Sequence, residues 1–241
     1  MSEQCKWLHE QLQNLPLIKF PFETADLPEN GIYFFYEEGE TWGHGRSLPR
    51  IVKVGTCTGS NNFRSRIEQH YLLGNCQRWM DFDLDRRAPK DRSVFRKHVG
   101  RALLNRDRDA YLSLWNHDWT KREEREQYRN LRNIEKEKRI ELAITELLRQ
   151  HFFFRFIVLE ASKGKRLELE KHLIATAAQC SLCRPSPSWL GNFSPDKRIR
   201  QNHLWLIQGA KDEPINEDDK KTTSEAIART REWIKHNWQH K

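Results

Sequence analysis

Glu170 is a carboxylate on the apolar face of a predicted helix, where a charged group calls for a chemical explanation. Leu167, Ile174 and Ala177 mark the apolar face of a helical pattern, and Glu170 follows Leu167 by three residues and precedes Ile174 by four. Its side chain is therefore expected to point towards the interior. A buried carboxylate is costly unless it is paired or binds a metal ion. Glu170 is thus a candidate metal ligand, and an ion pair with a buried arginine is the alternative.

Arg66 and His70 form a second candidate pair. They are one helical turn apart in a pattern whose apolar stripe is Phe63, Ile67 and Tyr71, so they project together. A guanidinium in that position can hold a phosphate and stabilise the charge that its transition state gains. The alternative is an ordinary surface arginine beside an ordinary surface histidine.

Two polar side chains lie within apolar runs that predict strands. Tyr33 belongs to Ile32–Tyr36, and Lys53 belongs to Ile51–Val54. A tyrosine in a strand usually packs in the core or against a neighbouring strand, and this is the ordinary interpretation of Tyr33. The charge of Lys53 must be desolvated or reach a partner, which makes this lysine a candidate phosphate contact or a base with a lowered pKa.

The elements that position these residues predict an α+β fold. Its core is a small, mostly antiparallel three-stranded sheet, flanked by helices and carrying a large helical insertion at about 74–150. We expect an N-terminal helical extension over 1–29, a main domain over 30–210, and a linker with a C-terminal amphipathic helix over 211–241. The expected strands are Gly31–Glu37, Arg50–Gly55 and Phe152–Glu160.

This order of motifs resembles the GIY-YIG nuclease family. Asn30-Gly31-Ile32-Tyr33 matches its first motif and Val52-Lys53-Val54-Gly55 its second, and the Arg66–His70 pair and Glu170 follow in the family's order. The resemblance covers residues 30–73 and 152–195. It implies that the domain over 30–210 is a GIY-YIG-like nuclease domain.

The resemblance also implies a role for each residue. Glu170 would be the sole protein ligand of a divalent cation, Mg²⁺ or Mn²⁺, and Arg66 would be the essential arginine. Tyr33 would lie beside the attacking water as general base or positioning group, with His70 as a helper. To act as a base, Tyr33 would need a pKa below the ordinary value of ~10. The implied activity is metal-dependent hydrolysis of DNA phosphodiester bonds, in restriction, defence or repair.

The chain departs from the family pattern at two places. Lys53 occupies the position where the second motif usually begins with tyrosine. The asparagine that usually ends the site is best matched by Asn192, which lies further past Glu170 than is typical, and Asn202 is the alternative. These departures support a competing hypothesis, a non-catalytic DNA-binding protein that keeps the nuclease fold. An RNA-cleaving relative is a third.

The insertion is a candidate surface for duplex DNA. Its basic side chains could contact phosphates, although a helical cover over the sheet is a nearly equal alternative. A single active site cuts one strand at a time, so cleavage of both strands would call for a homodimer or for sequential action. The expected DNA contacts are Arg86, Arg87, Arg96, Lys97 and Arg101.

The cysteines do not predict a metal site. Cys180 and Cys183 have the spacing of a zinc-binding pair, but a structural site needs four ligands, usually as two such pairs. Cys5, Cys57 and Cys76 form no second pair, so we expect buried thiols instead. Five cysteines at irregular spacings suit reduced thiols in a cytoplasmic protein.

Bulk composition agrees with a partner that is a polyanion. The formal net charge is +8, which favours nucleic acid only as a statement about the electrostatic field. No apolar run approaches the ~20 residues of a membrane span, so no membrane partner is expected. No secretory signal is visible at Met1–Cys5.

Overall fold

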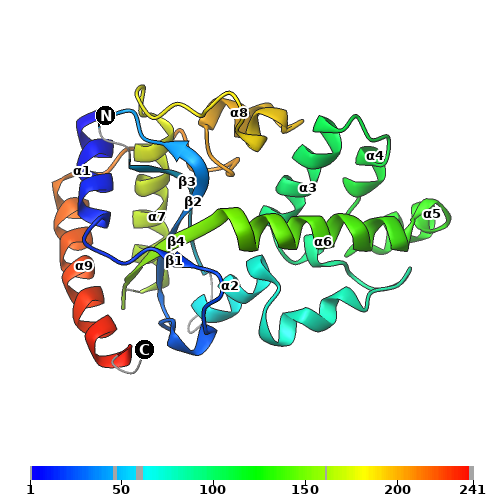
Figure 1. The fold of residues 1–241 in the computed structure, drawn as a ribbon, viewed down its shortest axis with the longest axis horizontal. Helices are drawn as coiled ribbons and strands as arrows, with labels where there is room; N and C mark the ends of the chain where they lie inside the picture. The colour runs from blue at the N-terminus through cyan, green and yellow to red at the C-terminus, as the bar shows by residue number, and fades with distance from the viewer. Residues whose placement is uncertain (1, 46–47, 58–61, 161, 239–241) are drawn as a thin grey trace.

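A four-stranded antiparallel sheet organises the protein, with strand order β1-β4-β2-β3 (Figure 1). The structure is a computed structural model, and it describes residues 2–45, 48–57, 62–160 and 162–238. The strands are β1 (Ile18–Lys19), β2 (Gly31–Thr41), β3 (Pro49–Thr56) and β4 (Phe152–Val158).

Strand β2 is covered on both faces because its side chains alternate between two apolar clusters. Tyr33 and Phe35 pack in one cluster, and Ile32, Phe34 and Tyr36 pack in the other. Successive side chains of a strand point to opposite faces, so this division follows from the chain itself. The apolar run Ile32–Tyr36 therefore lies between two layers of helices.

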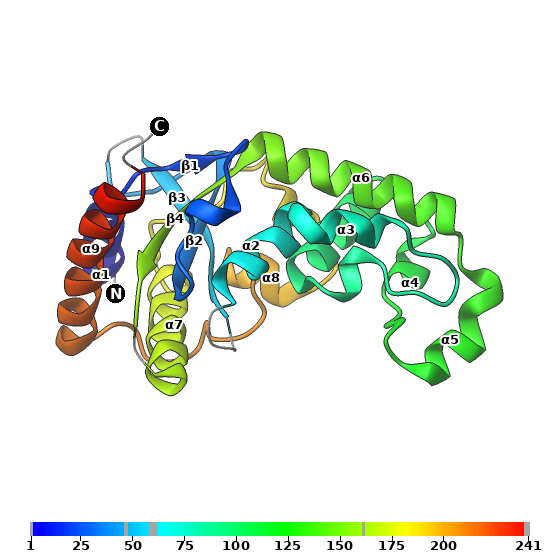
Figure 2. The same cartoon turned by 90° about the horizontal axis from the view of Figure 1, so that it is seen from below.

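Three helices cover one face of the sheet, and α2 with the insertion covers the other (Figures 1 and 2). The first layer contributes Leu8 of α1, Leu173 of α7 and Ile227 of α9 to the core. The bounds of these helices are α1 (Ser2–Leu12), α2 (Phe63–Tyr71), α7 (Lys163–Ala178) and α9 (Glu217–Asn237), with short elements η1 (Thr24–Asp26), η5 (Leu190–Phe193) and α8 (Lys197–Asn202) between them.

The insertion is helical, as expected, and its last helix, α6, leads directly into β4. The insertion extends away from the layer formed by α1, α7 and α9 (Figure 2). Its elements are η2 (Gly74–Met80), η3 (Pro89–Asp91), α3 (Val94–Arg106), α4 (Leu112–Trp115), α5 (Arg122–Tyr128), η4 (Arg129–Leu131) and α6 (Ile134–His151).

Arg96 lies inside this insertion and is not placed to contact DNA. Its side chain is 0% exposed and its Nη2 lies 2.7 Å from Glu141 Oε2. The guanidinium also donates to the Thr145 hydroxyl and to the backbone carbonyl of His70. A fully buried arginine whose donors are used in this way joins α3, α6 and α2, which is a structural role.

The α+β class is confirmed, with one strand more than expected. Strand β1 has two residues and pairs with β4 through Ile18↔Phe154 and Lys19↔Phe153. Periodicity cannot detect a strand this short. The expected division into extension, nuclease domain and C-terminal segment remains a prediction. Among the helices of the described ranges, none combines the length and the apolar character that crossing a membrane requires.

Candidate active site

Tyr33 and Lys53 lie on neighbouring strands and face α2 and the insertion. In the β2–β3 ladder Tyr33 is opposite Gly55, and Phe35 is opposite Lys53. A Cβ atom at residue 55 would overlap the hydroxyl group of Tyr33. The glycine of the second motif therefore provides the space that the Tyr33 phenol occupies.

A chain of hydrogen bonds runs from Tyr33 into the insertion. The Tyr33 hydroxyl lies 3.0 Å from His70 Nε2, and His70 Nδ1 lies 2.9 Å from the Ser93 hydroxyl. Tyr33 and His70 are each 1% exposed. The rings of Phe35 and Phe95 pack edge-on against His70, so the imidazole is held from several sides.

Burial sets the protonation of this pair. It raises the pKa of Tyr33 well above its ordinary value, and nearby Arg66 only partly offsets the increase. It lowers the pKa of His70 well below its ordinary value, and the positive charges of Arg66, Lys53 and Arg96 lower it further. At neutral pH the phenol and the imidazole are therefore both uncharged.

Lys53 is a buried amine in an aromatic environment. It is 7% exposed, and its Nζ lies 5.5 Å from the centroid of the Phe95 ring and 5.9 Å from that of Tyr33. Burial lowers its pKa to about 7, with Arg66 acting in the same direction and Glu170 opposing it. Lys53 can therefore exchange a proton near neutral pH.

Glu170 reaches the open edge of the sheet from α7. Its Oε1 accepts a hydrogen bond of 2.9 Å from the backbone N–H of Thr56, at the end of edge strand β3. The buried residues of α7 include Leu169, Leu173 and Ile174, whereas Glu170, like Leu167, is only half-buried and lies on the flank of the apolar face. Burial raises the pKa of Glu170, and the charge of Lys53 is the largest opposing influence.

Arg66 links the parts of the site. Its Nη1 donates to Gln69 Oε1 at 2.9 Å and contacts the backbone carbonyl of Arg92 at 3.4 Å. The charge of Arg66 affects the pKa values of Tyr33, Lys53, His70 and Glu170. Five residues singled out from the sequence thus lie within electrostatic reach of one another. They are separated by up to 137 residues along the chain, the interval between Tyr33 and Glu170.

The asparagines are engaged elsewhere. The Asn192 side-chain amide donates to the carbonyls of Ser186 and Pro187, at 2.9 and 3.2 Å, and so stabilises its own loop. Asn202 donates to the carbonyl of Leu206 at 3.0 Å. The role of Asn192 in the site remains a prediction.

Sequence reasoning missed the residues that support the site. Ser93 caps the N-terminus of α3 as well as bonding to His70. A serine before a helical pattern predicts a cap, but its contact with His70 depends on how the insertion packs. The Thr56 N–H could not be found either, because any residue type supplies a backbone donor.

A basic groove adjoins Arg66. Its volume is about 290 Å³, and the carbonyl contact of Arg92 with Arg66 connects it to the site. Arg92 stacks over Trp79 at 4.7 Å, whereas Arg86 and Arg87 are exposed. The lining residues are Arg78, Trp79, Asp81, Phe82, Asp85, Arg86, Arg87 and Arg92.

The other two expected DNA contacts, Lys97 and Arg101, lie on α3 and have protein partners. Lys97 Nζ is 3.4 Å from the His117 carbonyl, and burial lowers its pKa to about 8. Arg101 Nε donates to Asn116 Oδ1 at 2.5 Å. Both side chains are half-buried, and their contact with DNA remains a prediction.

The carboxylate of Glu170 is a suitable ligand for a divalent cation. Mg²⁺ prefers oxygen ligands and is often held by one or two carboxylates, with water and substrate phosphate completing its shell. The hydrogen bond from Thr56 fixes one oxygen of Glu170, which directs the carboxylate at the β3 edge where Arg66 and Lys53 also act. Glu170 is therefore the residue that would hold such an ion.

Comparison with known proteins agrees with this geometry. No curated protein and no solved structure matches the chain at a significant level. The family described as the GIY-YIG domain, in contrast, matches residues 5–232, which is nearly the whole sequence. The chain belongs to the GIY-YIG domain family, and this membership implies a nuclease-type function.

Proposed function

We propose that this protein is a metal-dependent endonuclease that hydrolyses phosphodiester bonds of duplex DNA. The observation that carries the proposal is the placement of the Glu170 carboxylate at the β3 edge, within electrostatic reach of Arg66 and Lys53. A carboxylate for a cation and two basic groups for a phosphate form a complete set for this hydrolysis. A protein that kept the nuclease fold but had lost its activity would have no need for the charge of Glu170 at this position.

Each side chain has a distinct role in this proposal. Glu170 binds Mg²⁺ or Mn²⁺, which when bound neutralises phosphate charge and eases departure of the 3′ oxygen. Arg66 holds the scissile phosphate and stabilises the charge that it gains as water attacks. Tyr33, kept as a neutral phenol, orients that water, and His70 fixes the direction of the phenol through its hydrogen bond.

Lys53 is the best candidate for the group that accepts the proton of water. A general base works best when its pKa is near the working pH. The raised pKa of Tyr33 and the lowered pKa of His70 make phenolate and imidazolium unfavourable, whereas the pKa of Lys53 is about 7. The amine of Lys53 would thus replace the tyrosine that the second motif usually carries.

The pH profile tests this role of Lys53. We expect kcat/KM to rise with pH through a midpoint at or slightly below pH 7, because the neutral amine is the active form. Lys53→Arg should lose this rise and most activity, since a guanidinium does not lose its proton. Single-turnover cleavage at fixed Mg²⁺ across pH 5.5–9, roughly the range around neutrality, is the measurement.

The control for this profile is Lys19→Arg, which changes an exposed lysine on β1. It should keep the profile of the unmodified protein. If Lys53 instead contacts phosphate as a cation, kcat/KM should fall with pH near 7, and Lys53→Arg should remain active. That result would contradict the assignment of Lys53 as the base.

The substrate is tested directly by incubating the protein with plasmid and linear DNA in Mg²⁺, Mn²⁺ or EDTA. Nicks or breaks that depend on the cation support the proposal. Undiminished cleavage in EDTA would contradict the metal role. Cleavage of RNA alone would assign the same site to the RNA-cleaving alternative. DNA binding without cleavage of any substrate would favour the non-catalytic alternative.

The basic groove should supply part of the DNA affinity. Replacing Arg78, Arg86 and Arg87 together by glutamine should weaken binding to unrelated duplexes. It should also make the slope of log affinity against log salt shallower by about 0.9 for each phosphate that the protein no longer neutralises. Fluorescence anisotropy over a salt series measures both effects.

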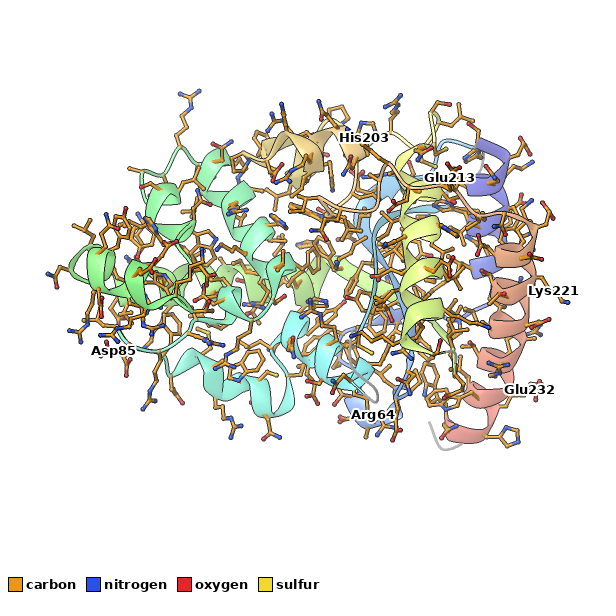
Figure 3. All side chains as sticks on the ribbon, turned by 180° about the vertical axis from the view of Figure 1, so that it is seen from behind. Arg64, Asp85, His203, Glu213, Lys221 and Glu232 are labelled. Atoms are coloured by element: carbon orange, nitrogen blue, oxygen red, sulfur yellow. The ribbon has the colours of Figure 1, made fainter. Side chains whose placement is uncertain are left out.

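The matched control neutralises three exposed cations of α9, Arg229, Arg231 and Lys235. Figure 3 shows Asp85, which lines the groove, at the opposite end of the molecule from Lys221 and Glu232 of α9. The control should leave the slope unchanged. An equal effect of both triple changes would show that the groove is not the binding surface.

A further inference from the structure

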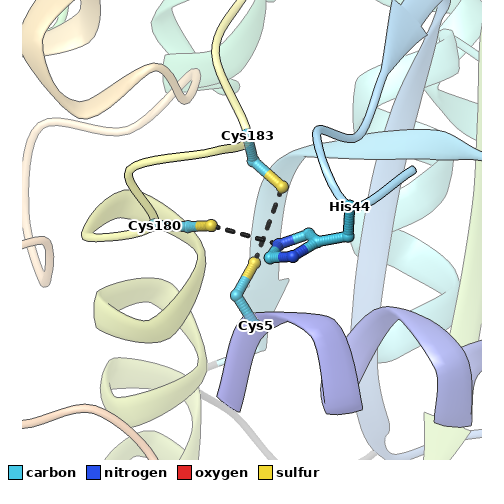
Figure 4. A group of neighbouring side chains, drawn as sticks. All are labelled: Cys5, His44, Cys180 and Cys183. Carbon is cyan, nitrogen blue, oxygen red and sulfur yellow. Dashed lines mark hydrogen bonds between the residues drawn. The ribbon is translucent and has the colours of Figure 1, made fainter. Parts of the chain in front are cut away.

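Four potential metal ligands, none of them a residue of the proposed active site, meet at one place (Figure 4). They are Cys5 of α1, His44 in the β2–β3 connection, and Cys180 and Cys183 in the turn after α7. Their ligand atoms all lie within 4.8 Å of one another. We infer that this cluster binds one zinc ion as a structural site, and the inference does not depend on the proposed function.

The distances suit tetrahedral coordination. Zinc bonds of ~2.3 Å to sulfur place two sulfur ligands of a tetrahedron ~3.8 Å apart. Cys5 Sγ and Cys183 Sγ are 3.7 Å apart, and Cys180 Sγ is 3.3 Å from His44 Nε2. A disulfide would require a sulfur–sulfur distance of ~2.05 Å. Three thiolates and an imidazole around one point are a set that zinc prefers, whereas Mg²⁺ and Mn²⁺ prefer oxygen.

The surroundings of the cluster support metal-bound thiolates. The backbone N–H groups of Leu182 and Cys183 donate to Cys180 Sγ, and the N–H of Gly43 donates to Cys183 Sγ. Such donors stabilise negative charge on sulfur. The three cysteines are buried and pack with Trp42, so water has little access to them. The hydrophobic shell and the N–H donors are the outer-shell features of protein metal sites.

The loops are shaped to meet at this point. A Cβ atom at Gly43 would overlap the backbone carbonyl of Leu182, so only glycine permits this approach of the β2–β3 connection to the turn after α7. The approach brings His44 to the two cysteines. A thiol cluster without an ion would gain nothing from this close approach of two backbones.

His9 provides a further support for Cys5. Its Nε2 accepts a hydrogen bond of 3.2 Å from the N–H of Ile51, so its Nδ1 carries the proton. That nitrogen lies 2.9 Å from the Cys5 carbonyl and donates to it. His9 therefore positions the helix turn that presents Cys5 and is not itself a ligand.

The site is closed, and its role is to hold three segments together. Four protein ligands leave no open position for substrate, which is typical of structural zinc. Glu170 and the last residue of α7, Ala178, are eight residues apart, a rise of about 12 Å along the helix, and Cys180 lies two residues further on. Zinc would join α1 and the β2–β3 connection to the end of the helix that carries Glu170.

Metal analysis of the purified full-length protein tests the inference. Inductively coupled plasma mass spectrometry should find about one zinc per chain, the stoichiometry of one four-ligand site. Cys183→Ser and His44→Ala should each reduce this content substantially. The matched controls are Cys76→Ser, a buried thiol outside the cluster, and Glu170→Gln, and both should retain the zinc.

A second measurement does not depend on the variants folding. Protein produced with Co²⁺ should show the visible absorption bands of tetrahedral cobalt and a thiolate charge-transfer band. Release of zinc by a mercurial should lower Tm, and Zn²⁺ but not Mg²⁺ should restore it once the mercurial is removed with excess thiol. Two results would overturn the inference. One is purified protein that lacks bound metal and has five freely reactive thiols. The other is metal-free protein with a disulfide between Cys5 and Cys183.

Discussion

Replacing Glu170 by glutamine is expected to abolish cleavage while the protein remains folded and bound to DNA. The amide has nearly the shape of the carboxylate and its oxygen can still accept the hydrogen bond from Thr56. It lacks the negative charge by which a carboxylate binds Mg²⁺ more strongly than a neutral amide oxygen does. The loss of rate should therefore exceed the ~10²–10³-fold that removal of one preorganised electrostatic group costs. Single-turnover cleavage of plasmid and a DNA-binding titration measure the two effects.

The control for this variant is Glu168→Gln, an exposed carboxylate on the same helix. It changes the charge equally and should cut at the rate of the unmodified protein. Normal cleavage by Glu170→Gln, combined with unfolding of Glu170→Ala, would show that Glu170 is only a structural partner of Thr56. The proposed site would then be wrong.

Replacing Arg66 by alanine is expected to lower kcat by about 10²–10³-fold, equivalent to about 2.7–4 kcal/mol of transition-state stabilisation. The charge of the guanidinium shifts the pKa values of Tyr33, Lys53 and Glu170. It therefore lies close to all three, where the phosphate would gain charge in the transition state. Arg66→Lys should recover only part of the rate, because an ammonium lacks the two-pronged geometry. Measured kcat and KM, with Tm as a check of folding, give the result.

Arg64 provides the matched control on the same helix. Its Nε donates to the Leu27 carbonyl at 2.6 Å, so its guanidinium is engaged by the segment that follows η1. Arg64→Ala can lower Tm but should leave kcat close to that of the unmodified protein. An increase in KM alone for Arg66→Ala would mean that Arg66 contributes equally to ground-state and transition-state binding.

Local patterns in the sequence were sufficient for most of the fold that surrounds the site. Short apolar runs predict β2, β3 and β4, and period-3.6 runs predict α2 and α7, because each depends on neighbouring residues only. The motifs also placed Tyr33, Arg66 and Glu170 on these elements. The two-residue β1 was missed, since it exists only through its pairing with β4.

Burial and charge state depend on tertiary packing. Arg96 looked like a surface cation because its helix carries several basic residues, but Glu141, which is 45 residues away, makes its burial possible. The sequence showed a lysine at residue 53, yet the rings of Phe95 and Tyr33 around its amine produce the lowered pKa. Neither effect has a local signal, because each depends on the side chains that folding brings near.

The ligands of the cysteine cluster could likewise be identified only in part from the sequence. Residue spacing is enough to identify the Cys180–Cys183 pair, its position after a helix, and the lack of a second pair in the sequence. Folding is what brings Cys5, 178 residues from Cys183, and His44 to the same point and completes a set of four ligands. A metal site requires convergence in space, and spacing along the chain records that convergence only when the ligands lie on one local element.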